Sequence, residues 1–422
     1  MPIVYDINGH WFHSRSSSSK EELEHIFLLV LESRDSKYKM LKWTENVPLA
    51  EQLAEKINIA TSTMRTKIRA FIRFGFLKDK STCPIELSEL GLIWESLKEF
   101  TDSKTKKARN NIEQLIISSA LSLYSFDKDG YILDPSKGFN PLTKLILSLD
   151  SDGKIANKTF SEIVGERNES YWLIDFTRSG MFTQKDNFIY YTKKYPILFD
   201  SCKTVSWPKN LKKEDWEQIH NNFLDHRNPL SNAIKEELSA IFKTLRDEVI
   251  PTIPKVEKSI DEMERILEKQ DEKDIEIGDY TIPDAFSQTR RRYKQNAWSK
   301  IVRRIYSFQC CVPECDAEGE FLVEASHIKP YRLQDDKELP HRANPSNGLC
   351  FCPNCHKLFD KGYFSFSDDL KVLTSPEALK VKKQNALIVI IKSDNKKINP
   401  MPSKYSPQKE FLGLHRKKIF RK

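Results

Sequence analysis

The chain has 422 residues, of which 39% are hydrophobic and 30% are charged, as in ordinary water-soluble globular proteins. This length suffices for roughly two to four domains, each with its own core. No apolar run approaches the ~20 residues of a membrane span, which excludes the usual helical membrane proteins. The net charge of +8 is mild, but residues 290–304 hold seven Lys or Arg and no acid. Such a patch suits a polyphosphate partner, although solvated helices often carry similar runs.

Residues 1–105 predict a small helical domain behind a polar, serine-rich arm. An apolar period of 3.6 residues starts a first helix at Lys20. Residues 48–80 then predict two short helices around a tight turn and a strand from Phe76, followed by a closing helix in LSELGLIWESL. This order resembles a winged helix-turn-helix, whose second helix enters the major groove of DNA.

The outward face of that second helix has the chemistry that DNA contact requires. Its positions are hydroxyl-bearing or basic, namely Ser62, Thr63, Arg65, Thr66, Arg69 and Arg73. We therefore expect it to recognise DNA. A winged helix that binds protein instead is the alternative.

Residues 106–202 repeat this plan less clearly. The alternating segment MFTQKDNFIYYT, with the polar turn KDN at its centre, predicts a wing hairpin. The helix before it contains Asp175, which suits phosphates poorly. We expect a second, degenerate winged helix that mainly packs, with DNA contact from Arg178, Lys185 and the wing.

Residues 203–283 predict a helical connector. Two long amphipathic helices are separated by Pro251 and Pro254, and a charged run follows them. We expect a flexible joint near residues 270–284. A short coiled-coil seam between two copies of the chain is an alternative.

Six of the eight cysteines fall within residues 310–362. The N-terminal segment has no signal-peptide pattern, so we expect a reducing compartment and disfavour disulfides. Two closely spaced pairs then predict a closed tetrahedral zinc site formed by Cys311, Cys315, Cys352 and Cys355. Cys310 and Cys350 lie beside these ligands and compete with them, Cys310 most directly with Cys311.

The same stretch predicts two strands and a helix. The alternating segment EFLVEASHI predicts a strand that ends at His327. The Asn-Gly pair at 347–348 predicts a turn, and LCF predicts a returning strand. A proline at the start of the next helix and a glycine at its end occupy their usual positions. The hairpin brings His327 opposite His356, which shares one helical face with Asp360.

These motifs resemble the HNH nuclease family, which has a ββα-metal fold, and more narrowly the HNH domains of restriction endonucleases. The resemblance covers residues 284–422, including a lead-in helix RRYKQNAWSKIVRRIYSFQC and a closing segment SPQKEFLGLHRKKIF. Its His-Ile-x-Pro, Asn-Gly-Leu and Cys-x-x-Cys-His-x-Leu-Phe-Asp-x-Gly motifs are matched by His327, Ile328, Pro330, Asn347, Gly348, Leu349, Cys352, Cys355, His356, Leu358, Phe359, Asp360 and Gly362.

The resemblance implies hydrolysis of phosphodiester bonds with a single divalent ion, Mg²⁺ or Mn²⁺. His327 would be the general base that takes a proton from water. His356 would bind the ion, and Asn347 would orient His327 or join the ligands of the ion. The predicted catalytic residues are therefore His327, Asn347 and His356.

One position departs from the family. Many members carry an acidic residue or His directly before the base, where this chain has Ser326. We therefore expect the second ligand of the ion at Asp360, with Glu324 as the alternative. The competing interpretation keeps both histidines as structural residues of a zinc fold. His415 in the tail is expected to be packed rather than a ligand.

The sequence thus predicts an α+β multidomain protein with a mostly helical N-terminal half. Its domains would be a winged-helix recognition domain at 1–105, a degenerate winged helix at 106–202, a helical connector at 203–283 and a zinc-stapled HNH domain at 284–422. DNA contact near the nuclease core is expected from Arg290, Arg291, Arg292 and Lys294.

Recognition modules fused to a nuclease predict a site-specific DNA endonuclease resembling type II restriction enzymes. Its partner would be double-stranded DNA, and duplex cleavage with one site per chain implies a homodimer, at least transiently. A companion methyltransferase, not in contact, would protect a bacterial or archaeal host, and the enzyme would be cytoplasmic with no membrane partner. The alternatives are a nicking or modification-dependent defence nuclease, or a DNA-binding regulator with an inactive HNH scaffold.

Overall fold

The computed structural model of the chain mixes helices with short strands and forms two compact units, Met1–Ile266 and Leu267–Lys422. The predicted connector range 203–283 crosses the boundary between these units, and the four predicted domain ranges stay predictions. None of the helices in the described ranges combines the length and apolar character that a bilayer-spanning segment needs. The structure describes residues 4–5, 54–55, 58, 71–72, 74–78, 86–123, 125–127, 130–132, 140–164, 169–208, 210–280, 288–330, 342–380, 385–400, 402 and 404–421.

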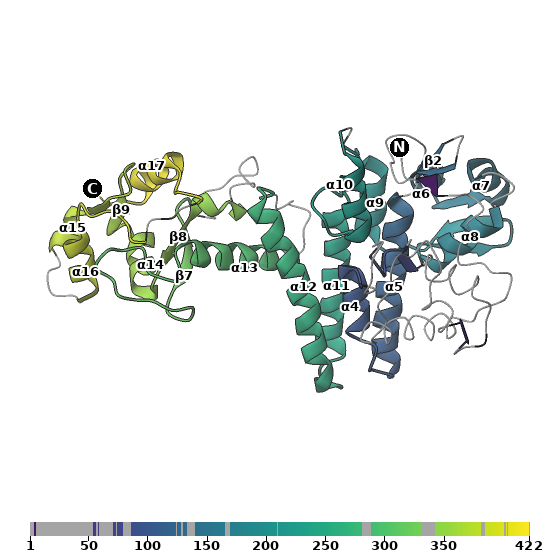
Figure 1. Cartoon of the computed structure of the whole chain (residues 1–422), viewed down its shortest axis with the longest axis horizontal. Helices are drawn as coiled ribbons and strands as arrows, with labels where there is room; N and C mark the ends of the chain where they lie inside the picture. Colours follow the sequence, from purple (N-terminus) through teal and green to yellow (C-terminus); the bar gives the residue numbers. More distant parts are fainter. Residues whose placement is uncertain are drawn as a thin grey trace. The chain divides into compact units, whose positions relative to one another are not determined.

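The first unit is built around the long helix α5 (Ser103–Leu123), as Figure 1 shows. One apolar face of α5 is buried against α4 (Glu89–Glu95) and α11 (Ser231–Glu248). The Ser88 hydroxyl caps α4 by accepting a hydrogen bond from Gly91 N at 2.9 Å. α4 confirms the closing helix predicted in LSELGLIWESL, and α11 confirms the first of the two long amphipathic helices predicted in the connector. The strand predicted from Phe76 is only a single bridge between Leu77 and Leu87.

The predicted recognition helix of the first winged helix lies outside the described residues, except for residues 71–72, which are helical and buried. This applies to all six of the side chains expected to contact DNA, which are Ser62, Thr63, Arg65, Thr66, Arg69 and Arg73. Their role therefore stays a prediction. A small sheet of order β1-β3-β2 also belongs to this unit and is formed by Val4–Tyr5, Gly130–Ile132 and Ser125–Asp127.

A second antiparallel sheet in this unit has the strand order β4-β6-β5. The alternating segment predicted as a hairpin forms its last two strands, with a positive φ of 55° at Asp186 in the turn. Trp172 and Phe176 of α8 are buried beneath it, stacked with their centroids 5.5 Å apart. The elements follow in the order α6 (Pro141–Leu147), β4 (Lys154–Ala156), α7 (Asn157–Val164), α8 (Glu169–Arg178), β5 (Phe182–Lys185) and β6 (Phe188–Tyr191).

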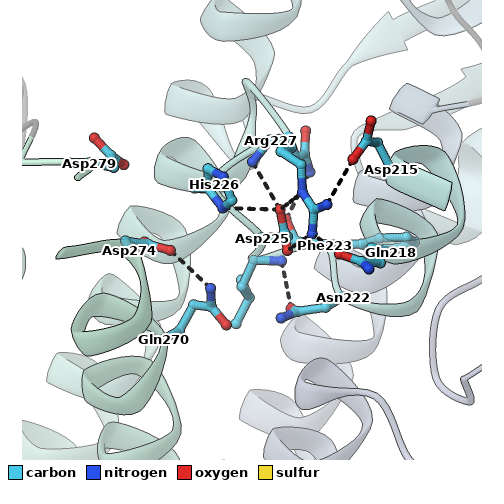
Figure 2. Close-up of polar contacts among 12 residues, drawn as sticks. Asp215, Gln218, Asn222, Phe223, Asp225, His226, Arg227, Gln270, Asp274 and Asp279 are labelled. Carbon is cyan, nitrogen blue, oxygen red and sulfur yellow. Dashed lines mark hydrogen bonds and ion pairs between the residues drawn. The ribbon is translucent and has the colours of Figure 1, made fainter. Parts of the chain in front are cut away.

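The connector region is helical, as predicted. It comprises α9 (Pro196–Thr204), α10 (Lys213–Asn221), α11 and α12 (Glu257–Glu276), with the two predicted proline breaks between α11 and α12. Because α12 stays helical through residue 276, the predicted joint does not begin at residue 270. The loop after α10 is held by Arg227, whose guanidinium donates to Asp215 and Asp225 at 2.8–2.9 Å, as seen in Figure 2.

In the second unit the last turns of α12 pack beside α13 (Gln288–Ile305), which is the predicted lead-in helix. The Lys300 ammonium lies 2.6 Å from the Glu268 carboxylate, and Arg304 lies 3.0 Å from Glu272. Two of the seven basic residues of the run that suggested a polyphosphate partner are therefore paired with acids within the fold.

The prediction that Lys294 contacts DNA is wrong, because this side chain is buried. Its side chain is 1% exposed, and its ammonium lies 4.0 Å from both the Asp274 and Asp279 carboxylates. Asp274 is itself fixed by Gln270, which donates to it at 2.9 Å (Figure 2). An ammonium that is buried among carboxylates cannot contact a phosphate, so Lys294 belongs to the interior of this unit. Arg291 is half-buried, and the side chains of Arg290 and Arg292 are not described.

The rest of the second unit is the predicted strand, strand and helix, with a C-terminal extension. Strand β7 (Glu324–His327) pairs antiparallel with β8 (Gly348–Phe351), and α14 (Pro353–Asp360) follows. A cluster of phenylalanines, Phe351, Phe359, Phe364 and Phe366, fills the core between them. The extension comprises β9 (Phe364–Phe366), β10 (Val372–Thr374), α15 (Pro376–Lys380), α16 (Asn385–Ser393) and α17 (Lys409–Lys418).

Gly348 occupies its position for a different reason from the one the sequence suggested. Its φ of −121° is extended, and it opens β8 directly after the 3₁₀ turn Pro345–Asn347. A Cβ at this position would lie 2.5 Å from Cγ2 of Val302 on α13. The glycine therefore permits β8 to approach α13 closely and does not form a hairpin turn.

Candidate active site and metal centre

Four cysteine thiols gather where α13, β8 and α14 meet. The Sγ atoms of Cys310, Cys315, Cys352 and Cys355 all lie within 4.8 Å of one another. Cys315 and Cys352 have their sulfurs 3.7 Å apart. Four thiolates bound at ~2.3 Å to a tetrahedral zinc ion would be ~3.8 Å apart, so this cluster fits a closed structural zinc site.

The cluster contains Cys310 where the sequence analysis expected Cys311, and that prediction was wrong. The backbone N–H of Cys310 donates to Ala317 O at 2.9 Å, whereas that of Cys311 donates to Cys350 O of β8 at 2.8 Å, so the two adjacent residues face different neighbours. The side chain of Cys311 enters the apolar core, where burial raises the pKa of the thiol. Cys350 is also buried in this core, and its pKa is raised to about 12.

His327 is the last residue of β7, where its backbone pairs with Gly348 of β8. Its imidazole stacks on the indole of Trp298 from α13, with ring centroids 3.8 Å apart and the planes inclined by 9°. Its Nε2 lies 2.9 Å from the carbonyl oxygen of Arg342. Since a carbonyl can only accept, Nε2 carries the proton and the lone pair of the neutral ring is on Nδ1.

Burial keeps this imidazole neutral. Desolvation lowers the pKa of His327 to about 4 and outweighs the hydrogen bond with the Arg342 carbonyl, which raises it. At neutral pH the ring is therefore unprotonated on Nδ1. A histidine in this state can accept a proton without first losing one.

Asn347 connects the two sides of the hairpin. Its side-chain oxygen accepts from Lys329 N at 2.8 Å, and its backbone oxygen accepts from Ile328 N at 2.9 Å. The side-chain amide also donates to Lys329 O at 3.4 Å. Asn347 is 0% exposed, so it fixes the segment that follows His327. The predicted alternative, that it binds the catalytic ion, does not fit this buried position.

His356 projects from α14 into a group of acids at the surface. Its Nδ1 lies 2.7 Å from a Glu324 carboxylate oxygen, and its Nε2 lies 3.5 Å from the Asp360 carboxylate. The side chain of His356 is 25% exposed, and those of the two acids are 50% and 55% exposed. The pair formed by Nε2 and Asp360 is the i, i+4 pair that the sequence predicted.

This group suits a cation. When Nδ1–H donates to Glu324, the Nε2 lone pair faces the Asp360 carboxylate, and two acceptors so close together need a proton or a metal ion between them. One imidazole nitrogen and one carboxylate, with the remaining positions open to water, match the donors that a hydrolytic Mg²⁺ or Mn²⁺ uses. Ser326, in contrast, is 1% exposed, and no described residue hydrogen-bonds its hydroxyl.

The C-terminal end of α14 is held by the chain terminus. Gly362 ends the helix with a φ of 74°, and a Cβ there would overlap the Ile419 carbonyl. Arg421 donates its backbone N–H to Gly362 O at 3.0 Å and its Nε to Lys361 O at 2.7 Å. His415 is buried and stacks on Phe359, as a packed residue should. The helix that carries His356 and Asp360 is thereby fixed at both ends.

The zinc assignment gives a paired test. A Cys310→Ser variant should lose the zinc, about one ion per chain for such a site, and should melt at a lower temperature. Cys311→Ser should keep its zinc, because that thiol faces the core. Metal content by mass spectrometry and melting by circular dichroism measure both effects. Zinc loss in the Cys311 variant alone would refute the assignment.

The state of His327 can be measured without any activity assay. In metal-free protein with isotope-labelled histidine, NMR should find the Nε2–H tautomer and a titration midpoint near pH 4. A His327→Asn variant identifies the signal. A midpoint near the ordinary histidine value of ~6.5 would mean that the ring is solvated and would contradict the geometry.

The comparisons with known proteins agree with this geometry. A family model described as HNH endonuclease matches residues 310–367, which include the cysteine cluster, β7, β8 and α14. None of the curated proteins that were compared with the chain matches it. The family match spans well under half of the chain and therefore identifies a domain. The chain carries an HNH endonuclease domain at residues 310–367.

Proposed function

We propose that the protein is a metal-dependent DNA endonuclease that cleaves at specific sites. The observation that carries this proposal is the pairing of two histidines in opposite states inside a matched HNH domain. His327 is partly buried, and its neutral ring can accept a proton at Nδ1, whereas His356 is partly exposed between two carboxylates. One is suited to act as a base and the other to bind a cation.

In this proposal the chemistry begins at Nδ1 of His327. That atom takes a proton from a water molecule, the water oxygen attacks the phosphorus, and one phosphorus–oxygen ester bond breaks. The leaving oxygen receives a proton from solvent. Arg342 O holds the Nε2–H of the ring throughout, so Nδ1 keeps its direction. Asn347 keeps the segment beyond the base in register.

His356 Nε2 and Asp360 would bind the catalytic ion. A bound Mg²⁺ or Mn²⁺ supplies stabilisation of the negative charge that develops on the phosphate and the leaving oxygen. Glu324 accepts from Nδ1 of His356 and thereby directs Nε2 away from itself, as carboxylates behind metal-binding histidines commonly do. Glu324 is thus better suited to orient His356 than to replace Asp360 as the second ligand.

Site specificity would come from the first unit. We propose winged helices at 1–105 and 106–202. For the second, support comes from the element order helix, strand, helix, helix, hairpin and from the strand order β4-β6-β5. Its α8 is a poor reader of DNA: Asp175 is buried, and burial lowers the pKa of Arg178. Lys185 in the hairpin is exposed and remains a candidate for phosphate contact.

Duplex cleavage by one site per chain calls for two copies acting together or in turn, so we propose at least a transient homodimer. A restriction role would pair the enzyme with a protective methyltransferase. A nicking or modification-dependent nuclease would have the same chemistry. The competing class is a DNA-binding regulator that retains the HNH fold without activity.

Digestion of unmethylated plasmid DNA tests the reaction and the specificity together. With Mg²⁺ or Mn²⁺ the wild-type protein should release discrete fragments whose sequenced ends share a flanking motif, and EDTA should prevent this. A smear would retain the nuclease and reject site specificity. Intact DNA with every metal, on both unmodified and modified substrates, would favour the regulator.

Substitution of His327 and of Asp360 should separate proton abstraction from binding of the catalytic ion. His327→Ala should reduce the cleavage rate by about 10²- to 10⁴-fold while DNA binding is retained. Asp360→Asn should raise the Mg²⁺ concentration needed for half-maximal rate. His226→Ala in the first unit and Asp369→Asn on the surface are the matched controls and should behave as wild type. Full activity in His327→Ala would refute its role as the base.

A further inference from the structure

Trp298 contacts the ring of the proposed general base directly. It lies on α13, far from the HNH motifs in the sequence, and it is 1% exposed. Its indole covers one face of the His327 imidazole at a centroid distance of 3.8 Å with nearly parallel planes. His415 stacks on Phe359 in the same way, at 3.8 Å, so what sets the Trp298 stack apart is the ring that it covers. The contact is thus a close, parallel stack on one particular ring.

The indole is itself anchored beside the atom that holds His327. Trp298 Nε1 donates to the carbonyl oxygen of Asn344 at 3.0 Å. That same oxygen accepts from Asn347 N at 2.9 Å, which closes the 3₁₀ turn before β8. Two residues earlier in this segment, Arg342 O accepts from His327 Nε2. One short segment therefore fixes both the edge of the imidazole and the plane of the indole on its face.

These contacts leave the imidazole one direction for chemistry. The strand fixes the Cα of His327, the indole fixes the ring plane, and the Arg342 carbonyl fixes the Nε2 edge. Loss of the indole would free rotation of the ring about χ2, which is intrinsically broad for histidine. The ring could then present either nitrogen to the substrate.

We propose that Trp298 is a positioning residue for the general base: its indole face holds the His327 ring so that Nδ1, and no other atom, points at the attacking water. This inference rests on the proposed nuclease function. Trp298 touches neither substrate nor metal in this role and acts only through His327. The indole also keeps water from one face of the ring, which adds to its desolvation.

Two substitutions separate the aromatic face from the anchoring hydrogen bond. Trp298→Phe keeps an aromatic face and loses the N–H, whereas Trp298→Leu loses both. Ile301→Ala, one turn along the buried face of α13, is the control for packing loss in the same helix. Melting temperatures of all three variants are measured first, so that activities are compared at temperatures where each is folded.

We expect Trp298→Leu to lower kcat by about 10- to 100-fold with KM for DNA nearly unchanged, since misplacement of a base costs rate rather than binding. Trp298→Phe should recover most of that loss. Ile301→Ala should lose stability and keep its kcat. In metal-free, DNA-free protein, the nitrogen NMR signals of His327 should change from one Nε2–H tautomer to a mixture in the leucine variant only.

The two readouts keep this inference separate from the proposed function. If the wild type does not cut DNA, the nuclease proposal fails, and the NMR arm still decides whether Trp298 orients the ring. A single unchanged tautomer in Trp298→Leu overturns the positioning role. A kcat loss no larger than that of Ile301→Ala overturns it as well.

Discussion

The cluster of four cysteine sulfurs is the constraint on which the second unit depends. It joins the loop after α13, which carries Cys310 and Cys315, to the junction of β8 and α14, which carries Cys352 and Cys355. Cys352 also caps α14 through its sulfur, which accepts from Cys355 N at 3.4 Å. The strand that carries His327 and the helix that carries His356 and Asp360 are thereby held in one geometry.

Within that frame, environment rather than residue type separates the two histidines. His327 is enclosed by an indole and a carbonyl, so desolvation favours its neutral form. His356 lies at the surface, with its two ring nitrogens facing the carboxylates of Glu324 and Asp360. The same imidazole can therefore serve as a proton acceptor in one place and as part of a cation site in the other. This division of roles is the physical basis of the proposed reaction.

Several basic side chains of the second unit form ion pairs with acids of the same unit. Lys300 and Arg304 of α13 pair with glutamates of α12, and Lys294 is buried beside two aspartates. A basic run in a sequence cannot be assigned to nucleic acid until its internal partners are known. The expected DNA contacts of this domain are correspondingly fewer than the seven basic residues of 290–304 suggested.

The sequence alone determined the elements of the HNH domain, because periodicity, proline and glycine positions and metal-ligand spacing are local properties. It located β7, β8 and α14 and placed His327, His356 and Asp360 on them. Only the tertiary structure decided between Cys310 and Cys311, since one residue of backbone register decides which thiol faces the cluster and which enters the core. It alone paired Trp298 with His327 and Glu324 with His356, because both contacts join segments that are distant in sequence, and packing is what brings them together.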